Sequence, residues 1–245
     1  MTDEDYGISG NHESINDLPS IKELRSSVAG FKLLGWLLWN SEIRETTRGI
    51  SEDIDELVSL VDDFYRLLGS RNWVFSNALD LERMRAVVSM PTAEDAEREL
   101  IEYLKEKGTL HWMISRMNRF PDMRPRMTLL EKAEEDFLAG RYYSSVLVTV
   151  SVMDGFMNDA SKSDGRKGLH ARTAEELHSV NCVATVWDGL PSVQKTFTRS
   201  VCARKDEPFY EVCRHGIMHG MIIDYDNDVV ASKAWCMLFG VGDWA

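Results

Sequence analysis

The chain has 245 residues, of which 44% are hydrophobic and 28% are charged, and its formal net charge is -12. A chain of this length can bury a sizeable core as one large domain or two small ones, and its composition is ordinary for a soluble globular protein. This net negative charge argues against non-specific coating of nucleic acid. No apolar run approaches the roughly 20 residues of a membrane span, so we expect a protein without membrane segments.

The start of the chain and its cysteines bear on its compartment. The first residues, Met1-Thr2-Asp3-Glu4-Asp5, are acidic, unlike a secretory signal. The cysteines show no close pairing and lie at Cys182, Cys202, Cys213 and Cys236. This spacing fits reduced core thiols better than a disulfide framework. We therefore expect a cytoplasmic protein.

Helical patterns dominate the first part of the chain. Residues 1–19 are polar and rich in turn formers, so we expect them to be disordered. Over residues 21–39 the apolar side chains recur at helical spacing. We assign residues 20–120 to an N-terminal helical region.

Two more helices are predicted in this region. One begins near Ser51, has acidic side chains in its first turn, and ends where Gly69 can close it. The aromatic segment 71–75 should pack on these helices. The other helix opens at Pro91 and runs to about Lys107.

The clearest boundary lies between Pro121 and Pro125. Beyond it we assign residues 125–242 to a second domain. This domain begins with a helix over 126–138, a break at a glycine turn, and a helix over 142–159. The stretch around this turn also fits one tetratricopeptide unit, but no repeat accompanies it.

The rest of the chain continues the helical pattern. A short helix is predicted over 173–178 after a polar, turn-rich segment. Asn227 or Asp228 is placed to cap a final apolar helix over 229–239. No strand pattern competes with these helices, so the sequence predicts an all-α fold.

Arg214, His215 and His219 form the most distinctive motif of the chain. If residues 209–223 are helical at about 100° per residue, these three side chains share one arc, and most apolar side chains lie opposite. Side chains on a helix lean toward its N-terminus, so His219 should lean back toward His215. A phosphate on that side would meet all three groups.

Gly216 and Gly220 lie one turn apart beside the apolar face of this predicted helix. A glycine inside a helix costs roughly 1 kcal/mol relative to alanine. We expect another helix to pack closely over Gly216. Gly220 fits the same contact, or it only ends the helix.

Three interpretations of the motif compete. His215 and His219 have the i, i+4 spacing of helical zinc sites, but the glutamate of the hydrolase version and a second ligand cluster are both missing. In a structural interpretation, Arg214 pairs with an acid such as Asp154 or Asp159. In the third interpretation, the histidines move protons and the arginine neutralises a phosphate.

The segment Arg214-His215-Gly216-Ile217-Met218-His219 resembles the R-x4-6-H motif of HEPN domains, which are all-α modules that include many ribonuclease toxins. Gly220 matches the glycine that often follows the motif. Further likeness to the Apea-like and abortive-infection-type branches lies in Gly140-Arg141-Tyr142-Tyr143, Met153-Asp154-Gly155-Phe156 and Ile223-Asp224-Tyr225. The similarity covers about residues 125–242.

The resemblance implies a fold and partners. It implies a four-helix up-and-down bundle, here with an insertion before the motif helix. HEPN proteins usually form homodimers in which two motif helices face one cleft, and Gly216 and Gly220 would lie in that contact. An antitoxin or another defence-system protein is an implied partner.

The resemblance also implies an activity, that of a metal-independent endoribonuclease of the toxin or phage-defence (abortive infection) type. The ribose 2′-OH attacks the adjacent phosphate, His219 transfers a proton, and Arg214 stabilises the pentacovalent phosphate. His215 holds the phosphate or shares the proton transfer. No metal or other cofactor is required. The alternative is a catalytically inactive HEPN-like module that binds RNA or dimerises and acts through a partner.

A basic segment directly precedes the motif. Residues 160–206 hold 8 basic and 5 acidic side chains, a net charge of +3 in an acidic chain. Such a segment can guide a polyanion such as RNA toward the motif. The candidate RNA-binding residues are Lys162, Arg166, Lys167, Arg172, Lys195, Arg199, Arg204 and Lys205.

Overall fold

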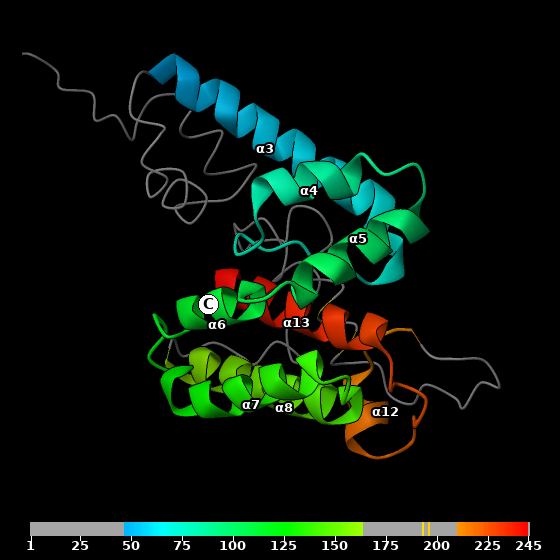
Figure 1. Cartoon of the computed structure of the whole chain (residues 1–245). Coiled ribbons are helices and arrows are strands. Elements are labelled where there is room, and N and C mark those ends of the chain that lie inside the picture. The colour runs from blue at the N-terminus through cyan, green and yellow to red at the C-terminus, as the bar shows by residue number, and fades with distance from the viewer. Residues whose placement is uncertain (1–46, 164–192, 194–195, 197–209, 245) are drawn as a thin grey trace, which may run out of the picture.

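A computed structural model describes residues 47–163, 193, 196 and 210–244 (Figure 1). Every regular element in these ranges is helical, which agrees with the expected all-α class. The α-helices are α3 (Thr47–Leu68), α4 (Leu81–Val88), α5 (Ala93–Lys105), α6 (Thr109–Met117), α7 (Met127–Leu138), α8 (Tyr142–Ser163), α12 (Arg214–Met218) and α13 (Asp228–Trp244). Two 3₁₀ turns, η3 (Gly69–Arg71) and η4 (Arg124–Arg126), complete the set. The helices expected over 21–39 and 173–178 lie outside these ranges.

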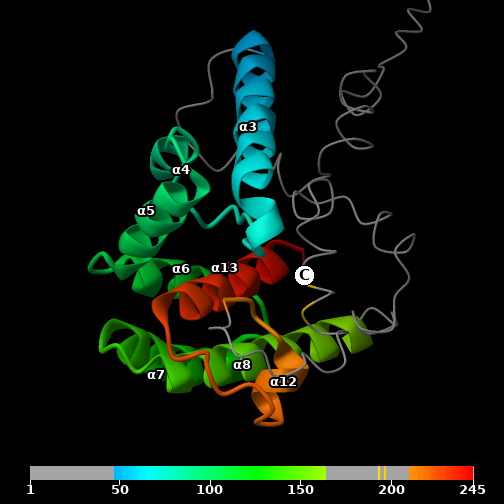
Figure 2. The ribbon, with the colours of Figure 1, turned by 90° about the vertical axis from the view of Figure 1, so that its right-hand side faces the viewer.

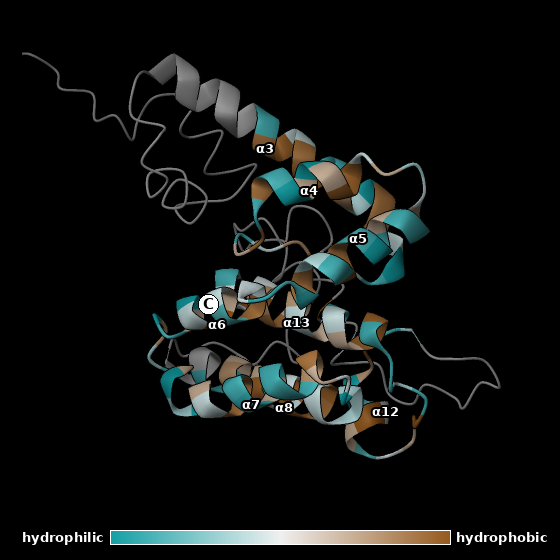
Figure 3. Cartoon of the chain, viewed as in Figure 1, coloured by the Kyte–Doolittle hydropathy of each residue, from teal (hydrophilic) through white to brown (hydrophobic). Residues whose placement is uncertain are grey.

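Helix α13 is the centre of the fold. Figures 1 and 2 show it between the α3–α5 layer and the paired helices α7 and α8. Every residue from Val230 to Asp243 is buried, as expected for a helix covered on all sides. By contrast, α5 and α7 carry both hydrophilic and hydrophobic residues in Figure 3, as helices with one solvent face do. None of the helices in the described ranges combines the length and apolarity needed to cross a bilayer.

Two glycines of α13 allow its neighbours to approach closely. A Cβ atom at Gly240 would lie 2.6 Å from Cγ1 of Val74 and 3.3 Å from the carbonyl oxygen of Phe75. A Cβ atom at Gly242 would lie 2.7 Å from Cε of Met117 on α6. Larger residues at these positions would push the aromatic segment and α6 away from the central helix.

Several expected helices are confirmed. Helix α3 contains the helix predicted from Ser51, α7 and α8 match the predictions over 126–138 and 142–159, and Gly140 makes the turn between them with φ +74°. The predicted cap of α13 is Asn227, whose Oδ1 accepts a hydrogen bond of 2.9 Å from the backbone N–H of Val230. The aromatic segment 71–75 packs into the core as expected, with Trp73 and Phe75 almost fully buried.

Other predictions need correction. Gly69 does not close α3 in a left-handed conformation; it begins η3, and the left-handed residue is Asn72, with φ +68°. Helices α4 and α6 were not predicted. Both are short, and α6 follows Gly108, which has φ +91° and supplies no capping side chain. With so few turns, neither helix displays enough of the apolar period to stand out in the sequence.

One hydrophobic core joins residues on both sides of the Pro121–Pro125 segment, from Leu57 on α3 to Val241 on α13. The division into residues 20–120 and 125–242 stays a prediction, as does the up-and-down bundle. The core also contains two of the cysteines as free thiols, Cys213 and Cys236. Burial raises the pKa of the Cys236 thiol.

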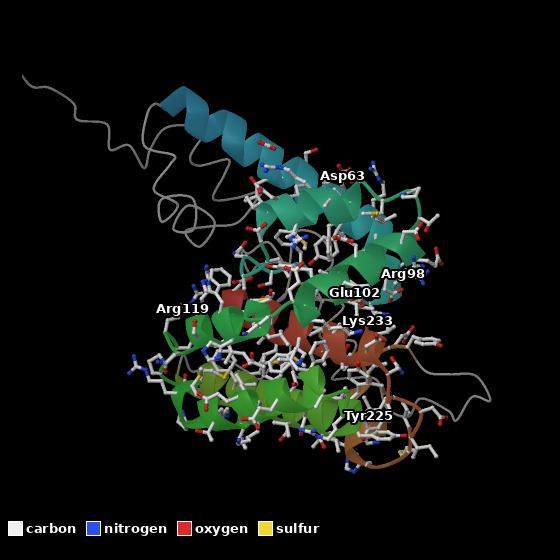
Figure 4. The ribbon with its side chains drawn as sticks, viewed as in Figure 1. Asp63, Arg98, Glu102, Arg119, Tyr225 and Lys233 are labelled. Carbon is white, nitrogen blue, oxygen red and sulfur yellow. The ribbon has the colours of Figure 1, made fainter. Side chains whose placement is uncertain are left out.

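A buried ion pair ties α5 to α13. Glu97 of α5 accepts a hydrogen bond of 3.0 Å from the indole N–H of Trp73 at Oε1, and the same oxygen lies 2.9 Å from Nζ of Lys233. Its other oxygen, Oε2, accepts a bond of 2.9 Å from Nε of Arg71. Lys233 is only 3% exposed and also donates to the carbonyl oxygen of Tyr210 at 2.8 Å. Figure 4 marks Lys233 on α13 beneath α5.

The two charges of this pair depend on each other. Burial by itself raises the pKa of Glu97, but the hydrogen bond and charge of Lys233, with the bonds from Trp73 and Arg71, bring it below its ordinary value of 4.5. Burial lowers the pKa of Lys233, and the Glu97 carboxylate offsets part of that effect. Removing the Glu97 carboxylate therefore leaves Lys233 as an uncompensated charge in the core.

We expect Glu97→Gln to destabilise the protein by about 3–5 kcal/mol near neutral pH, because Lys233 loses its buried counter-charge. The pKa of Glu97 is lower in the folded chain than its ordinary value of 4.5, so its contribution is complete above that value and is lost as the pH falls through the folded value. Stability should therefore fall less steeply on acidification in Glu97→Gln than in the wild type. Urea unfolding followed by tryptophan fluorescence measures both effects. Glu131→Gln, which removes an exposed carboxylate of α7 outside this cluster, is the control, and an equal acid dependence in Glu97→Gln and wild type would contradict this account.

Candidate functional site at Arg214, His215 and His219

The motif lies on α12, which is only five residues long (Arg214–Met218). The predicted helix over 209–223 is therefore wrong in its length. The backbone N–H of Gly220 bonds to the carbonyl oxygen of Ile217 at 3.1 Å, and that of Met221 bonds to the carbonyl oxygen of Gly216 at 2.8 Å. With Gly220 at φ +65°, this pair of bonds is a Schellman motif, which ends the helix. Gly220 is thus the helix terminator that the sequence had left as one of two options.

Gly216 is buried by its own chain rather than by another helix of this chain. After α12 the backbone turns back, and the side chain of Ile222 lies over Gly216. A Cβ atom at Gly216 would come within 2.8 Å of Cγ1 of Ile222, and closer still to Cδ1. The expected helix contact inside the chain is therefore replaced by a side chain six positions further on. The contact of Gly216 and Gly220 between two copies stays a prediction.

The expected apolar face holds only within the short helix and at its N-cap residue, Cys213. Cys213 and Ile217 are buried, as the projection predicts. Tyr210 and Met221, placed on the same face, are instead 50% and 38% exposed. They lie outside the five helical residues, so the helical projection does not apply to them.

Arg214 is held by an ion pair to α8. Its Nη2 donates to Oδ2 of Asp154 at 2.6 Å, which is one of the two acids expected from the sequence. The pair is partly buried, and the Nε atom of Arg214 is buried without a hydrogen-bond partner. This ion pair fixes the direction in which the guanidinium group of Arg214 points. The arrangement suits a structural arginine and equally a phosphate-binding one.

The other expected acid, Asp159, pairs elsewhere. Its Oδ2 accepts a hydrogen bond of 2.6 Å from Nη2 of Arg126, which precedes α7. Gly155 makes room for this contact, because a Cβ atom there would lie 2.9 Å from the Arg126 guanidinium. Helix α8 therefore holds one arginine at Asp154 and a different one at Asp159.

The two histidines lie side by side. Their ring centres are 4.5 Å apart and the planes are tilted by 54°. His219 is the C-cap residue of α12 and is exposed, while His215 is half-buried. The backbone N–H of His219 bonds to the carbonyl oxygen of His215 at 3.1 Å, so one helical turn sets the spacing of the rings. His219 thus leans toward His215, as expected.

The geometry bears on two interpretations of the histidine pair, a metal site and a pair of proton-transfer groups. In the ranges that the structure describes, no group of three or more His, Cys, Asp or Glu side chains is placed to hold a metal ion. A pair of imidazoles alone is short of the three or four protein ligands that zinc sites use. Adjacent imidazoles, one of them exposed, can instead exchange protons with a bound substrate.

A feature that the sequence did not indicate connects the loop after α12 to the start of α8. The hydroxyl of Tyr143 donates to the carbonyl oxygen of Ile223 at 2.6 Å, and the rings of Tyr143 and Tyr225 pack edge to face with their centres 4.9 Å apart. The backbone N–H of Tyr143 donates to Oδ1 of Asp226 at 3.1 Å. These bonds fix the loop that carries Ile222 over Gly216.

The candidate RNA-binding residues fall mostly outside the described ranges. Lys162 lies in the last turn of α8, but its side chain is not described. The other seven, Arg166, Lys167, Arg172, Lys195, Arg199, Arg204 and Lys205, lie between 164 and 209, outside the described residues. Their role stays a prediction.

Comparisons with known proteins do not decide among these interpretations. No family model matches the chain, and neither a curated protein nor a solved structure matches it. The function must therefore be argued from the site itself.

The contact between Gly216 and Ile222 can be tested by a double-mutant cycle. Gly216→Ala should destabilise the protein by about 1–3 kcal/mol, because the added methyl group displaces the Ile222 side chain. In an Ile222→Ala background the same change should cost much less, since the obstructing atoms are gone. Thermal unfolding of the four proteins measures the coupling. Equal costs in both backgrounds would mean that something other than Ile222 occupies the space over Gly216.

Proposed function

We propose that the chain is a metal-independent endoribonuclease with an HEPN-like site, of the toxin or phage-defence kind. The observation that carries the proposal is the pairing of two adjacent imidazoles, one of them exposed, with an arginine at the first position of the same short helix. Imidazoles transfer protons near neutral pH, and a guanidinium neutralises a phosphate without a metal.

The proposed reaction is a transfer within the RNA strand. The 2′-oxygen attacks the adjacent phosphorus, the bond to the 5′-oxygen of the next nucleotide breaks, and the products are a 2′,3′-cyclic phosphate and a 5′-hydroxyl. Neutral His219, the exposed imidazole, accepts the 2′-OH proton. Arg214 stabilises the negative charge on the pentacovalent phosphorus.

The leaving 5′-oxygen needs a proton from a different direction. Attacking and leaving oxygens lie roughly in line on opposite sides of the phosphorus. Because the ring centres of His215 and His219 are only 4.5 Å apart, both imidazoles reach the same side of one phosphate more readily than opposite sides. We therefore assign His215 to holding the phosphate, and the leaving-group proton to a group outside this helix. A second copy of the site would supply such a group, which favours the homodimer.

Asp154 has a positioning role in this proposal. Its ion pair with Arg214 fixes the guanidinium on α8, so the arginine is already oriented before RNA binds. The same ion pair also favours the second candidate, an inactive HEPN-like module that binds RNA or dimerises, because a structural arginine forms this contact too.

The first test is RNA cleavage in EDTA. The wild type should cleave a generic single-stranded RNA without divalent metal, and His219→Ala should be slower by about 10²–10⁴-fold because the proton acceptor is lost. Arg214→Ala should also be strongly impaired. Cleavage that stops on adding EDTA contradicts the metal-free mechanism, and undiminished cleavage by His219→Ala removes that residue from the chemistry.

A matched pair of variants tests the positioning role of Asp154. Asp154→Asn and Asp159→Asn each weaken one ion pair of 2.6 Å between α8 and an arginine. Only Asp154→Asn should lower the cleavage rate, by about tenfold or more, because only Asp154 holds the motif arginine. Thermal unfolding of both variants controls for loss of stability. An equal loss of rate in both would show that the effect comes from the stability of α8 and not from Arg214.

A further inference from the structure

The outer side of α6 carries an exposed indole with an arginine against it. Trp112 is 50% exposed, and Cζ of Arg116 lies 4.8 Å from the centre of its ring. A large aromatic side chain on a helix surface is a common element of binding sites, because its flat face is available to stack on a partner. The guanidinium beside it adds positive charge and a second flat surface.

A third residue continues this stripe. Arg119 follows Arg116 by three positions and Trp112 by seven, in the turn just beyond α6, and Figure 4 marks it at the outer end of that helix. Arg119 is half exposed, and its only ion pair among the described residues is a long one of 3.7 Å to Asp243. Burial lowers the pKa of Arg116, and the nearby charge of Arg119 lowers it further. The Arg119 guanidinium is held over the Phe120 ring, with Cζ 4.6 Å from the ring centre.

The surrounding segment is basic in an acidic chain. Residues 111–126 contain four arginines and one acidic residue, Asp122, so the net charge is 4 - 1 = +3, against -12 for the whole chain. Arg126 is committed to Asp159, and Arg124 is exposed and donates from Nε to the carbonyl oxygen of Asn118. A polyanion repelled by the rest of the chain would be attracted here.

This surface is separate from the Arg214 motif. Figure 1 shows α6 and α12 at opposite sides of the molecule, and Figure 4 places Arg119 at the outer end of α6. Within one chain the stripe is therefore too far from α12 to contribute to the cleavage chemistry. It requires a different explanation from the histidine pair.

We propose that Trp112, Arg116 and Arg119, here called the α6 platform, form a binding site for single-stranded RNA. An unpaired base stacks on the Trp112 indole, and the two guanidinium groups bind neighbouring phosphates. The choice of RNA as the polyanion rests on the proposed function. Single strands are favoured over duplexes because a base must be free to reach the indole.

The experiment measures binding separately from cleavage. A 5′-fluorescent single-stranded oligouridine is titrated with the Arg214→Ala protein, and anisotropy is recorded at several salt concentrations. The platform variants, made in the same background, are Trp112→Ala, Trp112→Phe and Arg116→Glu with Arg119→Glu. The matched control is Arg66→Glu with Arg98→Glu, which alters two exposed arginines on α3 and α5 by the same total charge. Thermal unfolding confirms that each variant is folded.

The expected results separate the platform from net charge. The double platform reversal should weaken binding at least tenfold more than the control reversal, and should lower the slope of log affinity against log salt by about 1–2. Trp112→Ala should weaken binding about fivefold or more, and Trp112→Phe less, because a ring remains for stacking. Equal losses in platform and control variants would overturn the inference.

Three further outcomes are decisive. If a polyglutamate peptide binds wild type with the same sensitivity to the platform variants while oligouridine does not, the platform is a site for an acidic protein, and the RNA inference fails. If oligouridine binding depends on the platform but the wild type never cleaves RNA, the inference stands and the proposed function fails. If wild type cleaves RNA and the platform variants neither bind nor cleave less well, the proposed function stands and the inference fails.

Discussion

The Lys233–Glu97 ion pair constrains the rest of the fold. It joins α13 to α5 in the core, and through Trp73 and Arg71 it also fixes the segment between α3 and α4. Burying two charges is tolerated only if they meet with good geometry, and a shifted register of α13 would leave Lys233 without its counter-charge and Glu97 with Arg71 alone. Lys233 also holds the carbonyl oxygen of Tyr210, a few residues before α12. The segment that leads into α12 is therefore held to the core at the carbonyl oxygen of Tyr210.

Prediction from sequence succeeded where local signals agree. Helices α7 and α8 have a helical apolar period and a glycine turn between them, α13 is an apolar run that follows a capping asparagine, and all three were found. The motif helix was overextended because apolar residues continue at helical spacing through Met221, whereas Gly220 adopts the left-handed conformation that ends α12. Helix α6 was too short to detect, so its Trp112 stripe could not be placed on a surface.

The candidate site could likewise be predicted only in part, because its residue types follow from chemistry but its contacts depend on packing. The pairing of Arg214 with Asp154 was among the options because an arginine in a helix bundle needs an acid, and only two acids on α8 were suitable. The choice between them depended on how α12 docks, which no local pattern contains. The burial of Glu97 was likewise beyond sequence reasoning, since its partners Trp73 and Arg71 lie 24 and 26 residues away and an isolated glutamate on a helix is usually exposed.

The near-complete burial of Lys233 makes this residue a built-in reporter of how the layers separate. An amine-reactive reagent needs access to Nζ, and in the folded chain that atom is enclosed by Glu97, Trp73 and the carbonyl of Tyr210. Labelling can proceed only when the α3–α5 layer parts from α13, so the rate at which Lys233 is modified follows the population of that opened state. A single lysine thus distinguishes local opening at the centre of the molecule from fraying at its surface.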